Sequence, residues 1–65
     1  MNIYVNGEIY SVPGKISASA LLETIPHPPL FAFEANGRII PPAQYDSFTI
    51  NENSKIEIVG FIGGG

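Results

Sequence analysis

Residues 55–65 read KIEIVGFIGGG, and this stretch does more than any other to decide the fold. Polar and apolar side chains alternate along its first part, which is typical of a strand with one buried face. Ile56 and Ile58 face the core in this pattern. The residues that face away from it are Glu57, Val59 and Phe61. The stretch therefore predicts a strand over residues 55–62, and its closing glycines predict a flexible tail, assigned to residues 61–65.

Two Asn-Gly dipeptides, Asn6-Gly7 and Asn36-Gly37, each predict a hairpin turn. Asparagine and glycine tolerate the positive φ angles that a type I′ turn requires, and both dipeptides stand between strand-like runs. The first hairpin spans residues 1–12, with a predicted core face of Met1, Ile3, Val5, Tyr10 and Val12. The second spans residues 31–40, with a predicted core face of Phe31, Phe33, Ala35 and Ile40.

Between the hairpins the sequence predicts a short helix. Its apolar side chains recur at helical spacing, namely Ala18, Leu21, Leu22 and Ile25. Ser17 is placed to cap the helix N-terminus, and Pro26 ends the helix because proline has no backbone N–H to donate. After the second hairpin, residues 43–47 predict one helical turn, and residues 51–54 predict a chain reversal.

The order hairpin, helix, hairpin, strand predicts an α+β fold with one main helix across one face of a mixed sheet of about four to five strands. The last strand follows both hairpins, so it is free to pair with the first strand in the centre of the sheet. Residues 1–65 contain no internal repeat and no linker, and we expect them to form a single domain.

Composition excludes several classes of function. The chain has 65 residues, six acidic and three basic side chains, and no cysteine. A domain of this length buries only about 60% of the surface of its unfolded chain, which leaves little room for an enclosed active site. The absence of cysteine excludes disulfides and thiolate chemistry, and the scattered basic residues make nucleic acid an unexpected partner. No apolar run approaches the roughly 18 residues of a membrane span, so we expect a cytoplasmic protein.

Few side chains are suited to catalysis or metal binding. His27 is the only histidine, and a closed zinc site needs about four strong ligands, so we expect a solvated loop histidine rather than a ligand or general base. Glu8, Glu34 and Glu57 are expected at turns or outward strand positions on a solvated sheet face. We therefore expect no metal site, no bound cofactor and no enzyme activity.

The glycine-rich end does not fit a phosphate-binding loop, because such loops need a following helix and usually a lysine. A glycine tail can instead thread a slot too narrow for side chains and present a terminal carboxylate to another protein. An inert flexible end is the alternative.

The chain resembles the ThiS group of ubiquitin-like, β-grasp sulfur carrier proteins over nearly its whole length. Residues 55–65 carry most of this resemblance, and residues 35–41, ANGRIIP, are similar to the family's strand, turn, strand and proline segment. Residues 26–29, PHPP, form a stiff connection that is not a recognised family feature.

The resemblance implies a carrier whose Gly65 carboxylate is adenylated by a ThiF-like enzyme with ATP. It also implies conversion to a thiocarboxylate with sulfur from a donor such as a cysteine desulfurase, and sulfur transfer to thiazole synthase in thiamine biosynthesis. Gly63 and Gly64 are then the threading residues of the tail. The expected partner-binding residues are Val59, Phe61 and Ile62, and a second small core under a loop is the alternative for such side chains.

Other functions fit the same features. A MoaD-like carrier for molybdopterin synthesis, or for another sulfurated metabolite, would share the fold, the tail and the activation chemistry. The short loops and the final strand favour thiamine among these pathways. A ubiquitin-like protein modifier would join Gly65 to a target lysine through an isopeptide bond. A plain binding module would keep its function without the glycines.

Overall fold

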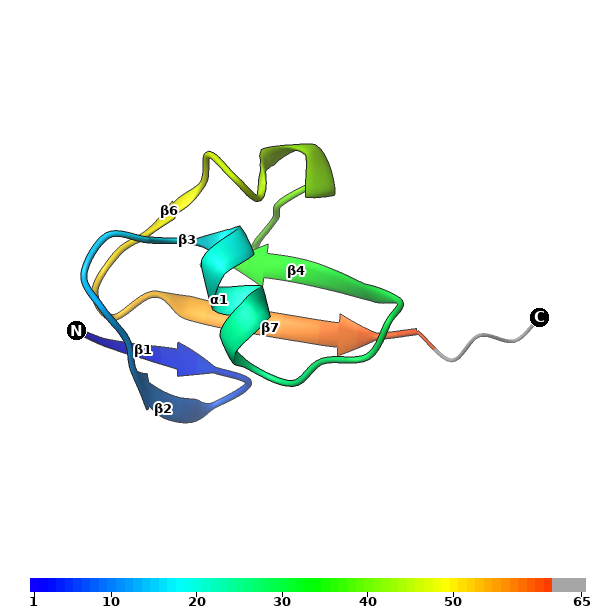
Figure 1. The fold of residues 1–65 in the computed structure, drawn as a ribbon. Helices are drawn as coiled ribbons and strands as arrows, with labels where there is room; N and C mark the ends of the chain where they lie inside the picture. The colour runs from blue at the N-terminus through cyan, green and yellow to red at the C-terminus, as the bar shows by residue number, and fades with distance from the viewer. Residues whose placement is uncertain (62–65) are drawn as a thin grey trace.

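The computed structural model describes residues 1–61, which form two sheets and one α-helix (Figure 1). In chain order the elements are β1 (Asn2–Val5), β2 (Glu8–Ser11), β3 (Ile16–Ser17), α1 (Ala18–Thr24), β4 (Phe31–Ala35), β5 (Arg38–Ile39), the 3-10 helix η1 (Pro42–Gln44), β6 (Thr49–Ile50) and β7 (Lys55–Gly60). Five strands form one sheet in the order β2-β1-β7-β4-β5, and β3 pairs with β6 in the other. Because α1 lies across one face of the five-stranded sheet, the predicted α+β architecture is confirmed.

Both predicted hairpins are present in the predicted register. Tyr4 pairs with Ile9 in the β1–β2 hairpin, and Glu34 pairs with Ile39 in the β4–β5 hairpin. Each turn has an asparagine with φ near 50° followed by a glycine with φ of 84°. These are the left-handed angles of a type I′ turn, so the Asn-Gly dipeptides fix where each hairpin reverses.

The last strand lies at the centre of the sheet, as the sequence predicts. β7 pairs in parallel with β1, where Val5 lies beside Ile56, and antiparallel with β4, where Phe31 lies opposite Gly60. β7 ends at Gly60 rather than continuing through Phe61, because Gly60 lies opposite Phe31, the first residue of β4, where the paired ladder stops. Residue 62, the predicted end of the strand, lies outside the described residues.

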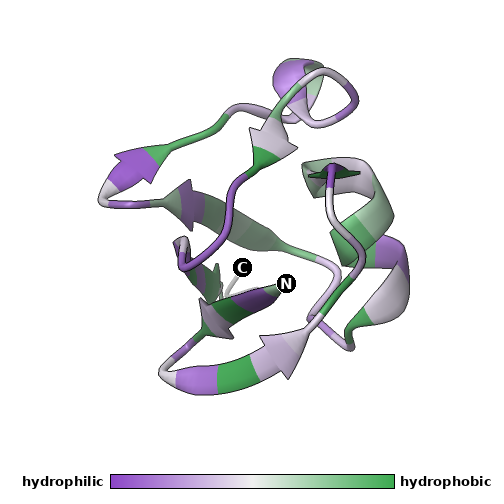
Figure 2. Cartoon of the chain, turned by 90° about the vertical axis from the view of Figure 1, so that its left-hand side faces the viewer, coloured by the Kyte–Doolittle hydropathy of each residue, from purple (hydrophilic) through white to green (hydrophobic). Residues whose placement is uncertain are grey.

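The core lies between α1 and the five-stranded sheet. Its largest fully buried side chains are Phe33, Ile3, Leu21, Ile40, Ile50 and Ile56. The helix begins after Ser17, whose Oγ accepts a hydrogen bond from the Ala20 N–H at 3.1 Å, so the predicted cap is confirmed. Figure 2 shows α1 on one side of the sheet, and no other element of residues 1–61 covers the opposite side. We call this uncovered side the outer face.

Two local features differ from the sequence prediction. The helical turn expected at residues 43–47 is instead η1 at Pro42–Gln44, because proline is well suited to the first position of a helix, where its missing N–H is not needed. The small β3–β6 sheet was not predicted. Its strands have two residues each, too few to show an alternating pattern, although they pair the buried Ile16 with the buried Ile50.

Candidate functional site

The candidate site is the end of β7, where the chain leaves the sheet toward its glycines. β7 is the central strand, and it ends at the side of the sheet away from the N-terminus (Figure 1). Ile62, Gly63, Gly64 and Gly65 lie outside the described residues, so their expected roles stay predictions. The described residues show how the chain is held as far as Phe61.

Asn6 holds one edge of this strand through its carboxamide. Its Oδ1 accepts a hydrogen bond from the Ile58 N–H at 2.8 Å, and its Nδ2 donates to the Ile58 carbonyl at 3.2 Å. The Asn6 backbone N–H donates to the Ile56 carbonyl at 2.9 Å. The side chain therefore extends the parallel pairing of β1 and β7 beyond Val5, where β1 ends. Sequence reasoning assigned Asn6 to its turn alone and missed this second role.

The segment between α1 and β4 holds the other edge. A Cβ atom on Gly60 would lie only 2.7 Å from Cγ of Pro28, closer than real side chains approach. One residue further on, the Phe61 N–H donates to the Leu30 carbonyl at 3.0 Å. The segment at residues 26–29, whose role the sequence left open, thus packs over the end of β7 and requires glycine at position 60.

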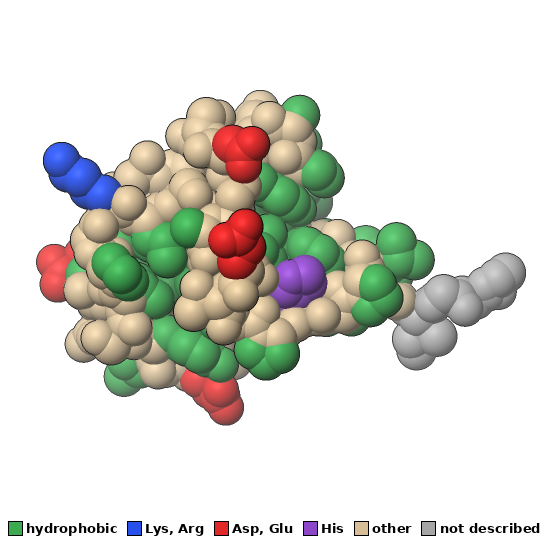
Figure 3. Space-filling model, in the orientation of Figure 1, with side chains coloured by type: hydrophobic (Ala, Val, Ile, Leu, Met, Phe, Trp, Pro, Cys, Tyr) green, Lys and Arg blue, Asp and Glu red, His purple; other side chains and the backbone are tan. Residues whose placement is uncertain are grey.

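His27 ties the same segment to the helix. Its Nδ1 and Nε2 lie 2.9 and 3.1 Å from the carbonyl oxygens of Pro28 and Leu22, and its ring centroid lies 4.5 Å from that of Phe31. Figure 3 shows the histidine on the surface near the end of the described chain. A neutral imidazole donates to one of these two carbonyls and a protonated one to both. The side chain thus has a structural role at an exposed position, as expected of a loop histidine.

Within residues 1–61, no group of three or more histidine, aspartate or glutamate side chains is placed to hold a metal ion. No helix in that part of the chain is long and apolar enough to cross a membrane.

Exposed apolar side chains lie beside the strand exit. Val59 and Phe61, two of the expected partner-binding residues, are 45% and 58% exposed, so neither belongs to a second core. Leu30 is also 58% exposed, and its carbonyl accepts the hydrogen bond from the Phe61 N–H just beyond the last β4–β7 pair. The sequence did not indicate Leu30, because this residue precedes β4. Its neighbour, Phe61, is 31 positions away and is set by the pairing of β4 with β7.

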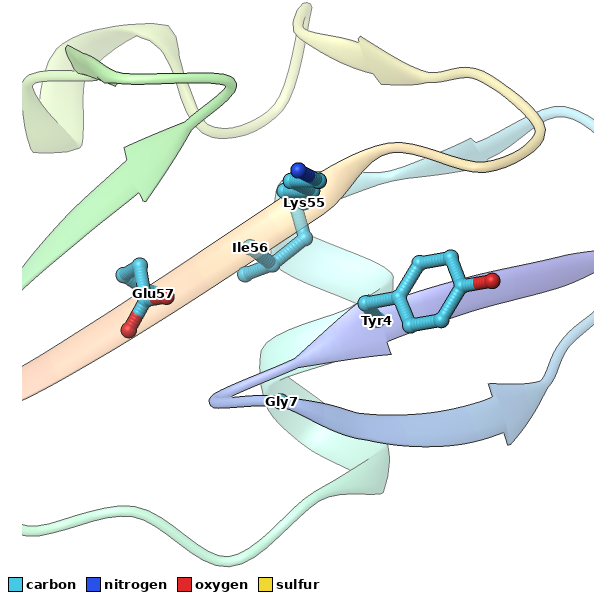
Figure 4. Close-up of a pocket in the computed structure, with 5 residues that line it drawn as sticks. All are labelled: Tyr4, Gly7, Lys55, Ile56 and Glu57. Atoms are coloured by element: carbon cyan, nitrogen blue, oxygen red, sulfur yellow. The ribbon is translucent and has the colours of Figure 1, made fainter.

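The outer face also carries an acidic pair. Glu34 of β4 lies directly opposite Glu57 of β7, with Glu34 half-buried and Glu57 exposed. Next to Glu57 is a shallow hollow of about 240 Å³, shown in Figure 4. It is lined by Tyr4, Gly7, Lys55, Ile56 and Glu57. The sequence places both glutamates on the outer face, but it does not show that they are paired.

Comparisons with known proteins give a consistent result. A model of the ThiS family matches residues 3–65. The chain is also similar to the crystal structure of a thiamine biosynthesis protein (ThiS) from Geobacter metallireducens, with a TM-score of 0.85, 26% identity and 100% coverage of both chains.

A further relative is a thiazole synthase from Paramagnetospirillum magneticum, to which the chain is 36% identical over 66 residues. This match covers all of the chain but only 20% of that protein, so the chain spans about a fifth of the length of this curated relative.

Proposed function

The chain belongs to the ThiS family of β-grasp sulfur carrier proteins, and on this basis we propose that it carries sulfur for thiamine biosynthesis as a thiocarboxylate on Gly65. The observation that carries the proposal is the extent of the family match, which runs to residue 65 and so includes the glycine tail. The proposal takes Gly65 as the terminal residue of the working protein.

The proposed activation uses the reactivity of the tail and the catalytic groups of other proteins. A carboxylate is a poor electrophile, so the Gly65 carboxylate first attacks ATP in a ThiF-like enzyme, and pyrophosphate leaves. A persulfide from a donor such as a cysteine desulfurase then attacks the acyl carbon, and AMP leaves with one carboxyl oxygen. A second thiol then attacks the donor sulfur of the resulting acyl disulfide and forms a new disulfide with it, and the thiocarboxylate on Gly65 is the leaving group.

In this scheme the chain is a co-substrate rather than an enzyme. Gly63 and Gly64 have no side chains, so the tail fits a narrow channel in which the carboxylate reaches the reacting groups. The body contributes a fixed starting point for the tail, because the hydrogen bonds of Asn6 and Leu30 hold the end of β7. We propose a cytoplasmic location for the chain, and because it has no cysteine, its sulfur is carried on the terminal carboxyl group rather than on a thiol.

Thiazole synthase is the proposed sulfur acceptor. A protein of that description contains, over a fifth of its length, a segment 36% identical to this chain. A carrier-like segment joined to a thiazole synthase in one polypeptide is the arrangement expected when the carrier supplies sulfur to the synthase. This observation favours thiazole synthase over an acceptor in molybdopterin synthesis.

The test is an intact-mass measurement. The purified chain is incubated with a ThiF-like enzyme, ATP and a sulfur donor, with matched reactions that omit ATP or omit the donor. We expect one oxygen to be replaced by one sulfur only in the complete reaction, and no change in a variant that lacks Gly65. An unchanged mass with an active activating enzyme would refute the carrier function, and conjugates on lysine side chains would identify a protein modifier.

A deletion strain separates the two cofactor pathways. A strain without this chain should need thiamine or its thiazole precursor for growth. A requirement for molybdenum cofactor instead would show that the MoaD-like alternative is correct.

A further inference from the structure

The outer face carries a continuous apolar strip next to the strand exit. Val59 lies opposite Ala32, and just beyond the last β4–β7 pair the Phe61 N–H donates to the Leu30 carbonyl, which brings these two residues together. Three of these four side chains are large and about half exposed, whereas Ala32 is half-buried. Contiguous exposed apolar surface of this kind marks interaction sites on soluble proteins. We call Leu30, Ala32, Val59 and Phe61 the exit strip.

The Glu34–Glu57 pair forms the next row of the same face. Like charges directly opposite each other destabilise a sheet, so this pair weakens the free protein. Lys55 lies two residues before Glu57 and lines the same hollow, but one lysine leaves the two carboxylates with an excess negative charge. An arginine or lysine of a partner placed over the pair would relieve the repulsion.

The length of the tail restricts where a partner binds. Four residues follow Phe61, and they span at most about 14 Å when fully extended. An enzyme that reacts with Gly65 must therefore approach the exit closely. A standard interface of about 800 Å² per partner corresponds to a disc of roughly 16 Å radius. Glu57 lies four residues before Phe61, or about 13 Å along the strand, so an interface of this size that is centred on Phe61 and covers the outer face includes the acidic pair.

We propose that the exit strip and the Glu34–Glu57 pair together form the docking surface for thiazole synthase. The partner surface has an apolar rim over Leu30, Val59 and Phe61, and an arginine or lysine side chain over the two carboxylates. Thiazole synthase is the chosen occupant because a relative of that description contains a segment like this chain. The proposal rests on the proposed function, since it takes Gly65 as the group that enters the enzyme.

The test measures binding of the full chain to the purified thiazole synthase of the same organism, without ATP or sulfur donor. Glu34→Gln and Glu57→Gln each remove one charge from the pair, and Val59→Thr makes the strip polar with little change of shape. Glu23→Gln is the matched control, because Glu23 is an exposed glutamate on α1, across the sheet from the outer face. We expect each of the first three variants to bind at least about tenfold more weakly, and the control to bind like the original chain.

Two further readouts distinguish docking from a structural role. Both glutamine variants should melt at the same temperature as the original chain or higher, because the like-charge pair is gone. Affinity of the original chain should fall as salt rises, and the Glu57→Gln variant should show a shallower fall.

Several results would overturn the proposal. They are no binding by the original chain, equal weakening by Glu23→Gln and Glu57→Gln, or a loss of stability in the glutamine variants. Sensitivity of the ThiF-like enzyme alone to these variants would show that the occupant is wrong. Docking is measured without sulfur chemistry, so the two proposals can fail separately. Loss of docking with normal thiocarboxylate formation would refute the docking surface and leave the proposed function intact. Normal docking without thiocarboxylate formation would refute the proposed function and leave the docking surface intact.

Discussion

Replacing Asn6 with glycine tests whether a side chain outside the strands holds the central strand in place. Glycine keeps the φ of 50° without strain, so the turn itself is preserved. The substitution removes both hydrogen bonds between the carboxamide and Ile58. Asn36 provides a matched control, because it has a φ of 52° in the same kind of turn and makes one such bond, accepting from the Lys55 N–H at 2.9 Å.

The expected cost follows from the number of bonds. A hydrogen bond contributes a net 0.5–1.5 kcal/mol or so, and two therefore contribute about 1–3 kcal/mol. The greater flexibility of glycine in the unfolded chain adds about 0.5–1 kcal/mol to both variants. Asn6→Gly should thus lower the free energy of unfolding by about 0.5–1.5 kcal/mol more than Asn36→Gly.

Urea unfolding measures this difference directly. Both variants should show a lower midpoint with an unchanged m-value, since neither alters the surface exposed on unfolding. For a domain of this size, a difference of about 1 kcal/mol corresponds to roughly 4–8 °C in Tm. If Asn6→Gly costs no more than Asn36→Gly, the carboxamide does not stabilise β7 as argued.

Three other predictions concern Gly60, Tyr45 and Gly65. Gly60→Ala should destabilise the fold by about 1–3 kcal/mol, because its Cβ meets the rigid Pro28 ring, whereas Gly14→Ala, which faces open space, should have little effect on Tm. Burial raises the pKa of Tyr45 above its ordinary value of 10.0, because the charged phenolate is poorly solvated. The stability that the neutral Tyr45 side chain contributes is therefore fully present below about pH 10 and is lost as the pH rises further. Tyr45→Phe should remove this fall from a curve of stability against pH. Deleting Gly65 should leave Tm nearly unchanged while abolishing thiocarboxylate formation in the mass assay.

Much of the fold follows from short-range patterns. The Asn-Gly dipeptides set both turns and both registers, and the alternation in residues 55–60 sets which side of β7 meets the core. The stripe from Ala18 to Ile25 and the cap at Ser17 place the helix. These features are local, because each depends on residues a few positions apart.

The contacts that hold the strand exit could not be predicted in the same way. Asn6 and Ile58 are 52 positions apart, and Pro28 and Gly60 are 32 positions apart, so no local pattern reveals either contact. The turn alone also accounts for an asparagine at position 6, so the sequence does not indicate a second role for its side chain. The outward direction of Val59 could be predicted from alternation, but the opposition of Glu34 and Glu57 required the register of two strands that are distant in sequence.

The most direct test of the sulfur carrier function is to follow a labelled sulfur atom. The chain is loaded with isotopically labelled sulfur by the ThiF-like enzyme, freed of small molecules, and mixed with thiazole synthase and its other substrates. Our account predicts that the label appears in the thiazole product and that the chain returns to its original mass. Label that stays on the chain, or a thiazole that forms with unlabelled sulfur, would contradict it.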